Sequence, residues 1–284
     1  MELRLDLLGK PAVHGNGSSD VEIPLSLQPF LGYLGVERPA VCHRERMIDA
    51  LWPRLAPDQG RRRLNTVVWR ARALFGAARE VVHTSRTGHI ALDLGTVDVD
   101  IAPTVAALSD ENRSAATRAD PRAMAQLQQA VLTDAEDFLV GCYDDWVMQA
   151  RNQLRLTIIS GIETLLATAS SADEAILWAE LLVRRDPLRE DAHRRLIRLY
   201  AEGGRRSDAL RQYEVCERRL REDLGVEPLI ETTLVATAVR EGLEPLKVRE
   251  PDPVCALREM QRALASCQLA VEQIETAITS LPTS

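Results

Sequence analysis

Residues 58–76 combine an apolar stripe with a basic face, and this stretch constrains the fold more than any other. Its apolar positions recur at steps of four, three and four: Leu64, Val68, Ala71 and Phe75. That spacing lines one side of an α-helix. Asp58 can act as the N-cap that accepts a bond from free backbone N–H groups, and Gly76 stands where a helix commonly ends. The stretch therefore predicts an amphipathic helix against which neighbouring elements pack.

The opposite side of the predicted helix is basic. Its polar side chains are Arg62, Arg63, Asn65, Thr66, Arg70 and Arg72. Within residues 58–76 no carboxylate follows Asp58. Surface helices usually carry charges of both signs, because Glu–Arg pairs four residues apart stabilise them. Arginines attract phosphates, and Arg and Asn side chains can read the edges of guanine or adenine. A solvated arginine-rich surface is the plainer interpretation, but the pattern favours contact with nucleic acid.

The chain is acidic overall and basic only locally. The net charge of the 284 residues is −7. Residues 1–100 carry 13 Arg and Lys against 12 Asp and Glu, whereas the remainder carries 22 against 30. Residues 54–90 alone carry eight Arg against two carboxylates. Because docking on DNA requires only a local basic surface, the acidic total does not exclude it.

Length and composition indicate a helix-rich protein of more than one domain. A chain of 284 residues exceeds the usual size of one core, and 45% apolar residues with only 4% aromatic ones favour helical packing. The five cysteines include no C-x-x-C pair, which indicates neither a disulfide framework nor a zinc site. Without a signal peptide or a transmembrane run, we expect a soluble cytoplasmic protein.

The first hundred residues predict a small domain of strands and helices. The predicted strands are residues 2–8, 12–14, 21–25, 81–84 and 90–94, and the predicted helices are residues 26–35, 43–52 and 58–76. Three strands, three helices and a C-terminal hairpin are the parts of a winged helix. Its third helix enters the major groove of DNA, and its hairpin forms the wing.

Three segments carry a resemblance to a known family. They are residues 44–52 (RERMIDALW), residues 61–72 (RRRLNTVVWRAR) and the tip formed by Thr87 and Gly88. These segments resemble the DNA-binding domain of the Streptomyces antibiotic regulatory proteins, which have the winged helix of OmpR/PhoB-type response regulators. The resemblance implies a winged-helix DNA-binding domain over residues 1–97.

The same resemblance implies which residues touch DNA and polymerase. The residues expected in the groove or on its phosphates are Arg61, Arg62, Arg63, Asn65, Thr66, Val67, Arg70 and Arg72. The residues expected at the wing are Arg86 and Thr87. The loop before the third helix matches one that can contact RNA polymerase in this superfamily, which makes Arg54, Leu55 and Asp58 candidate contacts.

Residues 98–241 predict an all-α domain with an internal repeat of 34 residues. Ile162, Leu166, Ala175 and Ala179 recur as Leu196, Tyr200, Ala209 and Tyr213. Such spacing is typical of tetratricopeptide-like helical hairpins, and a plain helical bundle is the alternative. Residues 186–193 and 220–228 also resemble the bacterial transcriptional activation domain, which follows the winged helix in the same family.

The C-terminal residues predict a linker and a further helix. Residues 242–253 are rich in proline and charged residues, and we expect them to form a linker between the helical domain and the last helix. In residues 254–281, apolar positions alternate steps of three and four: Leu257, Met260, Leu264, Cys267, Val271, Ile274, Ile278 and Leu281. This heptad pattern predicts an amphipathic or coiled-coil helix. Leu257, Met260, Leu264, Val271, Ile274 and Ile278 are candidates for self-association, with folding back on the helical domain as the alternative.

The sequence as a whole predicts a mainly α-helical transcriptional activator. We expect it to bind directly repeated promoter sites in double-stranded DNA as a homodimer at the nucleoid and to contact RNA polymerase. No motif indicates catalysis, a metal, a cofactor, a small-molecule substrate or a membrane, so we do not expect an enzyme. The alternative is a signalling scaffold in which the winged helix and the tetratricopeptide-like helices bind protein partners.

Overall fold

The computed structural model describes residues 3–15, 21–37, 40–118 and 120–243. Contacts divide the chain into two compact units, residues 1–187 and residues 188–284. The predicted domain limits at residues 97 and 241 stay predictions. The predicted helix over residues 254–281, with its self-association candidates, lies outside the described residues.

A four-stranded sheet opens the first unit. Its strands are β1 (Leu3–Asp6), β2 (Ala12–His14), β3 (Val21–Glu22) and β7 (Val97–Val99). Their order is β3-β2-β1-β7, and only the β1–β7 pair is parallel. Leu5 pairs with Val13 and with Val99, and all three side chains are buried. The alternating pattern of the first residues is therefore confirmed as a half-buried strand.

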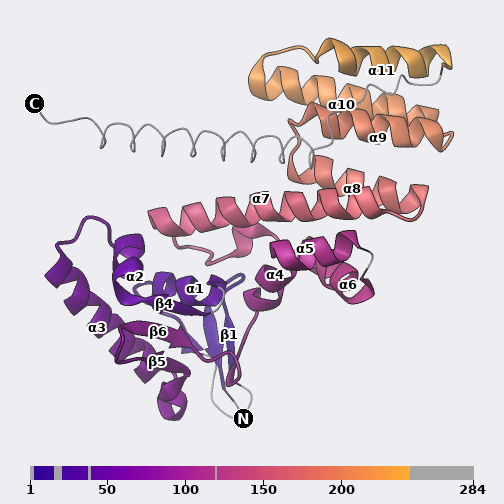
Figure 1. Cartoon of the computed structure of the whole chain (residues 1–284). Coiled ribbons are helices and arrows are strands. Elements are labelled where there is room, and N and C mark those ends of the chain that lie inside the picture. The colour runs from indigo at the N-terminus through magenta and orange to yellow at the C-terminus, as the bar shows by residue number, and fades with distance from the viewer. Residues whose placement is uncertain (1–2, 16–20, 38–39, 119, 244–284) are drawn as a thin grey trace, which may run out of the picture. The chain divides into compact units, whose positions relative to one another are not determined.

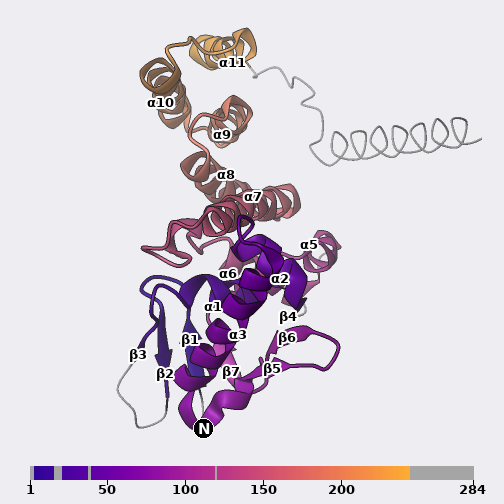
Figure 2. The same ribbon diagram turned by 90° about the vertical axis from the view of Figure 1, so that its left-hand side faces the viewer.

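Three helices and a second sheet follow. The helices are α1 (Gln28–Val36), α2 (Arg44–Leu51) and α3 (Pro57–Leu74), and the 3-10 helix η1 (Gly76–Val81) follows them. The second sheet contains β4 (Val41–His43), β5 (Val82–Thr84) and β6 (His89–Leu92), in the antiparallel order β4-β6-β5. Figures 1 and 2 show α3 running beside the β5–β6 hairpin.

The long helix α3 begins one residue earlier than the sequence predicts. The N-cap is Ala56 without a side-chain bond, so the prediction that Asp58 caps the helix is wrong. Pro57 takes the first helical position, where its fixed φ suits the helix and no N–H is lost from the ladder. Asp58 lies in the first turn, where a carboxylate still faces the positive end of the helix. At the other end, Gly76 has φ +56°, which confirms it as the residue after the helix.

Helix α1 packs closely on two neighbouring segments. A Cβ at Gly35 would lie 2.4 Å from Leu7 Cδ1, and one at Gly32 would lie 2.5 Å from Leu139 Cδ1. The helix continues to Val36, so the prediction that it ends at Gly35 is wrong by one residue. Both positions need glycine because a methyl group there would overlap a buried side chain.

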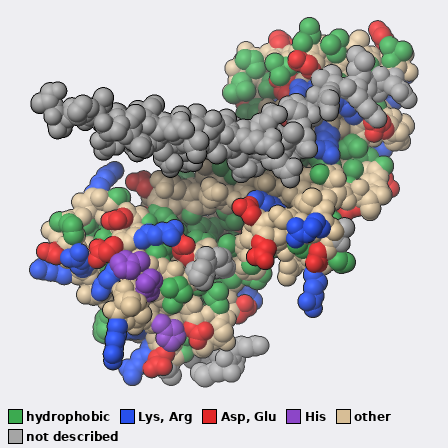
Figure 3. Space-filling model, viewed as in Figure 1, with side chains coloured by type: hydrophobic (Ala, Val, Ile, Leu, Met, Phe, Trp, Pro, Cys, Tyr) green, Lys and Arg blue, Asp and Glu red, His purple; other side chains and the backbone are tan. Residues whose placement is uncertain are grey.

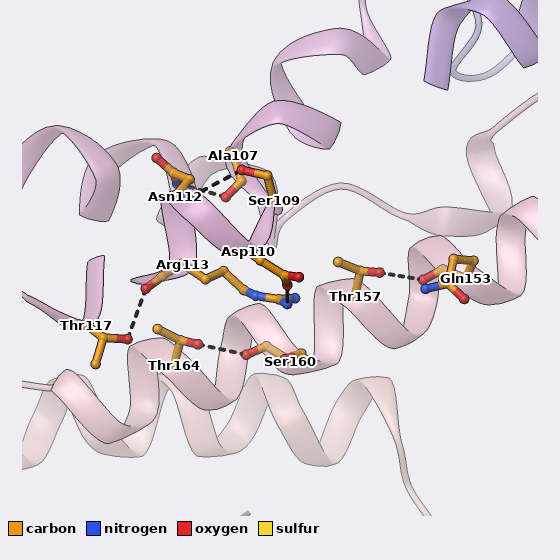
Figure 4. A network of polar contacts seen from close by, with 10 residues as sticks. All are labelled: Ala107, Ser109, Asp110, Asn112, Arg113, Thr117, Gln153, Thr157, Ser160 and Thr164. Carbon is orange, nitrogen blue, oxygen red and sulfur yellow. Dashed lines mark hydrogen bonds and ion pairs between the residues drawn. The ribbon is translucent and has the colours of Figure 1, made fainter. Parts of the chain in front are cut away.

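Five helices complete the first unit. They are α4 (Ile101–Ala107), α5 (Asp110–Thr117), α6 (Pro121–Ala130), α7 (Asp145–Thr168) and α8 (Ala172–Arg185), with the 3-10 helix η2 (Ala135–Asp137) before α7. Figure 4 shows the turn from α4 to α5, where Ser109 Oγ accepts from the backbone N–H of Asn112 at 3.3 Å. The Asn112 amide donates to the carbonyl of Ala107 at 2.7 Å, which satisfies the end of α4.

The segment between α6 and α7 joins the first sheet to the helices. The backbone N–H of Leu139 donates to Leu7 O at 2.7 Å, and Phe138 forms a β-bridge with Leu8. The ring of Trp146, in the first turn of α7, lies 5.2 Å from that of Tyr33 on α1 and 6.2 Å from that of Phe138. Residues far apart in the sequence thus form one continuous core.

The second unit contains three described helices. They are α9 (Glu190–Glu202), α10 (Arg206–Leu224) and α11 (Ile230–Glu241), each in contact with the other two. Glu190 Oε2 accepts from Leu229 N at 2.8 Å and from Thr232 Oγ1 at 2.6 Å, which ties α9 to the start of α11. The repeated apolar positions fall on the consecutive pairs α7/α8 and α9/α10, and seven of the eight are buried, with Ala175 half-buried. Helical hairpins at this period are therefore confirmed.

The structure also bears on the cysteines and on membrane-spanning helices, within the residues that it describes. Cys42, Cys142 and Cys216 are free and buried. Among the described helices we find none with an apolar run long enough to cross a bilayer.

Candidate nucleic-acid interface

Helix α3 is held against α2 by a close contact near its start. A Cβ at Gly60 would lie 2.4 Å from Ile48 Cγ2, so only glycine lets the two helices approach this closely. Leu64 and Ala71, with no exposed surface, and Val68 and Phe75 continue the packed side. The predicted apolar stripe is confirmed.

The outer side of α3 is exposed along its length. Its exposed side chains include Arg61, Arg62, Arg63, Asn65, Thr66, Trp69 and Arg70. Asn65 and Trp69 are one turn apart, as are Arg62 and Thr66, so they form two adjacent rows. Figure 3 shows basic and histidine side chains over α2, α3 and the β5–β6 hairpin.

Two residues of this helix depart from the sequence prediction. Val67 was expected to face bases, but only 6% of it is exposed, so this expectation is wrong. It lies next to Val68 and three residues after Leu64, and the core covers a wider arc of α3 than the four stripe residues indicate. Trp69 is 69% exposed and was not predicted as a site residue. The sequence indicates its exposure only by its position, which is next to Arg70 and off the apolar stripe.

Two of the arginines already have partners. Arg61 Nε donates to Glu45 Oε1 at 3.0 Å, and Arg61 Nη1 lies 3.3 Å from Asp58 Oδ1. The hydrogen bond with Glu45 raises the pKa of Arg61 above its usual value. The guanidinium of Arg63 lies 5.0 Å from the centre of the Trp52 ring, a cation–π distance. The charge of Arg61 is thus partly offset, whereas that of Arg63 is not.

Arg72 connects α3 to the hairpin. Its Nε donates to Val82 O at 2.9 Å, and its Nη2 donates to Thr84 Oγ1 at 2.9 Å. Two of its donors are therefore used inside the protein. These bonds hold β5 beside α3. The side chain is half-buried, so part of it stays accessible to solvent.

The tip of the hairpin is ordered by its own hydroxyl groups. Ser85 Oγ and Thr87 Oγ1 are 2.8 Å apart, and Thr87 Oγ1 lies 3.0 Å from His89 Nδ1. Gly88 has φ +82°, a conformation that favours glycine. Arg86 and Thr87 are exposed at this tip. The structure thus brings both predicted hairpin residues to one edge.

A hollow of about 260 Å³ separates α3 from the hairpin. It is lined by Arg44, Asn65, Val68, Trp69, Arg72, Thr84, Ser85, Gly88, His89 and Ile90. Polar and cationic groups surround an apolar floor of Val68 and Ile90. Such a surface suits an extended anionic backbone better than a small apolar ligand.

Of the residues predicted to contact polymerase, Arg54 and Leu55 lie in the loop between α2 and α3, and Asp58 lies in the first turn of α3. Arg54 and Asp58 are exposed and Leu55 is half-buried. Leu55 N donates to Trp52 O at 3.1 Å, which closes a turn in this loop. Their positions allow a protein contact beside the start of α3.

Comparison with known proteins identifies the class. Residues 99–240, half of the chain, match the bacterial transcriptional activator domain. Proteins with this domain are non-enzymatic regulators of transcription. The chain belongs to the bacterial transcriptional activator domain family. The comparison with curated proteins gave no match.

A solved structure is similar over most of the chain. It is EmbR of Mycobacterium tuberculosis in complex with a low affinity phosphopeptide. The sequences are 21% identical, the TM-score is 0.54, and the match covers 94% of this chain and 71% of EmbR. At this identity the likeness shows a shared fold. The mainly helical fold with a small N-terminal sheet region is thereby confirmed.

Proposed function

We propose that this protein is a sequence-specific DNA-binding transcriptional activator of the Streptomyces antibiotic regulatory type. Residues 1–97 would form a winged helix, with α3 as the recognition helix and the β5–β6 hairpin as the wing. Residues 98–241 would form the activation domain. A chain of the transcriptional activator family needs a way to reach promoters, and α3 is the part best suited to supply it.

The single observation that carries the proposal is the exposed row on α3. Arg62 and Arg70 are exposed and have no ion-pair partner among the residues that the structure describes. Two unpaired cations on one side of a long helix attract phosphates and release counterions when DNA binds. Asn65 and Thr66 lie between them and can reach base edges.

The hydroxyl of Thr66 has a defined role in this scheme. Thr66 Oγ1 donates to the carbonyl of Arg62 at 3.1 Å. Because its proton is used, the oxygen is left to accept a bond from an exocyclic amine of cytosine or adenine. The exposed indole of Trp69 offers an apolar surface to a thymine methyl group.

Other surfaces would serve assembly on the promoter. Arg86 and Thr87 would contact the backbone or minor groove beside the wing, and Arg54, Leu55 and Asp58 would contact RNA polymerase. We infer that two copies bind neighbouring direct repeats, with residues 254–281 as one candidate for their pairing.

The first prediction tests DNA binding. A randomised duplex library is selected with the full chain, and affinity for the selected site and for unrelated DNA is measured by fluorescence anisotropy. We expect Arg70→Ala to weaken binding to both duplexes, since it removes a phosphate contact. We expect Asn65→Ala to weaken binding to the selected site by about 1–3 kcal/mol and to leave the affinity for unrelated DNA unchanged.

The matched control is Arg211→Ala, which removes an exposed arginine from α10. Its affinity should equal that of the wild type. Failure of the wild type to bind any duplex, or equal affinity of all variants, would overturn the proposal. Binding to a protein partner alone would instead favour the signalling scaffold.

A further inference from the structure

A hydrogen bond between Arg44, the first residue of α2, and Asn65, on the exposed side of α3, links the two helices. Arg44 Nη2 donates to Asn65 Oδ1 at 2.7 Å. The two residues are 21 positions apart in the sequence, so this contact exists only because α2 and α3 pack together. Asn65 itself is exposed on the surface proposed to meet DNA.

The chemistry of the pair fixes the orientation of the amide. A guanidinium group only donates, so the partner atom on Asn65 must be the oxygen. The ambiguity that normally attends the two ends of an amide is thereby removed. The Nδ2 group, with its two protons, then points away from Arg44 and has no hydrogen-bond partner among the described residues.

Arg44 is in turn held by the hairpin. Its backbone N–H donates to Gly88 O at 2.9 Å. A Cβ at Gly88 would lie 3.5 Å from Arg44 Cδ and 3.7 Å from its Cγ, so the aliphatic stem lies against the hairpin tip. The orientation of Asn65 therefore depends on the hairpin as well as on α2.

We propose that Arg44 is a positioning residue that presents Asn65 to DNA as a donor, so that this position prefers guanine to adenine. Reading adenine with both ends of the amide requires its oxygen to accept from N6 and its nitrogen to donate to N7. Because one lone pair of the oxygen is used and the oxygen is held toward Arg44, the free N–H groups are the better-placed contacts, and they match the O6 and N7 acceptors of guanine. This inference rests on the proposed DNA binding and adds the base preference and the residue that sets it.

A second role for Arg44 gives a different experimental result. Its Nε is buried and has no partner in the described part of the chain. If another nitrogen of this guanidinium binds a phosphate, the loss of Arg44 weakens binding to all sequences alike. Base preference separates the two roles, because a phosphate contact carries no sequence information.

The second prediction uses duplexes selected by the wild type, with each guanine replaced in turn by adenine. In Arg44→Met, which keeps the stem but removes the donor, we expect the preference for guanine at one position to fall about tenfold. Arg44→Lys keeps a cationic donor and should retain part of the preference. In an Asn65→Ala background, Arg44→Met should leave the preference unchanged, since Arg44 acts through Asn65.

The control is Arg46→Met, which removes the same charge from the same helix. Arg46 Nη2 lies 3.1 Å from Glu37 Oε1 rather than near α3. Its base preference should match the wild type. An equal loss for every duplex in Arg44→Met, or an effect that persists without Asn65, would overturn the inference and leave DNA binding intact. Absence of duplex binding by the wild type would overturn the proposed function itself.

Discussion

At the scale of single residues, burial decides which side chains of α3 are available. The spacing of Leu64, Val68 and Ala71 predicted the packed side correctly because a helix repeats every 3.6 residues. The same spacing did not show where that side ends. Val67 is buried although the family resemblance placed it against bases, and Trp69 is exposed although its ring is largely apolar. The edge of a buried face depends on neighbouring elements, and a periodic pattern does not contain them.

Burial also sets the chemistry of two thiols. Removal from water raises the pKa of Cys142 to about 11 and that of Cys216 to about 12. An unfolded thiol has a pKa of about 8.5. The folded chain therefore holds these protons more tightly than the unfolded chain. The associated stability is complete below about pH 8.5 and is lost as pH rises towards the folded values.

The third prediction follows from this sign. The free energy of unfolding, measured by urea denaturation under reducing conditions, should fall between about pH 8.5 and pH 10. Cys216→Ala removes one titrating group, so its stability should fall less steeply over the same range. An unchanged slope in this variant would show that the thiol does not contribute.

At the scale of elements, the segment from η2 to α7 determines how the first unit holds together. Arg151 of α7 is 5% exposed and donates from Nε to Phe138 O at 2.8 Å and from Nη2 to Leu139 O at 2.7 Å. Leu139 has φ 53°, unusual for a residue other than glycine. The guanidinium therefore holds an uncommon backbone conformation beside α1.

The fourth prediction concerns this contact. Arg151→Met should lower the free energy of unfolding by about 2–5 kcal/mol, because two buried carbonyl groups lose their donor. Chemical denaturation monitored by Trp fluorescence measures the change. Arg155→Met, an exposed arginine one turn later on α7, is the control and should alter stability by less than about 0.5 kcal/mol. Equal effects of the two variants would contradict the role given to Arg151.

At the scale of the whole molecule, charge is separated along the chain. Residues 54–90 carry eight arginines, whereas residues 101–284 have an excess of eight carboxylates. The arginines of residues 54–90 would release counterions when they meet phosphates, so DNA binding should be sensitive to salt.

The fifth prediction is a salt titration of DNA binding by the full chain. The logarithm of the binding constant should fall linearly with the logarithm of salt concentration. Arg62→Ala and Arg70→Ala should each reduce that slope by about one phosphate contact. Arg211→Ala should leave it unchanged. A slope that does not respond to either α3 variant would place the phosphate contacts elsewhere.

The sequence does not predict the short strands β4 and β7. It does predict the other strands and the three helices of residues 1–94, the buried stripe of α3 and the helical repeat. These are local or periodic properties, written in the spacing of apolar residues and in turn residues such as Gly76. That Arg62, Asn65 and Arg70 touch DNA stays a prediction.

The partners of the polar side chains follow from the packing of distant segments. The pairing of Arg61 with Glu45, of Arg72 with the hairpin and of Arg44 with Asn65 joins residues that the sequence separates. The burial of Val67 and the packing of Phe138 on α1 have the same origin. A side chain's partners depend on how close two backbones approach, and glycines such as Gly32 and Gly60 set that distance here.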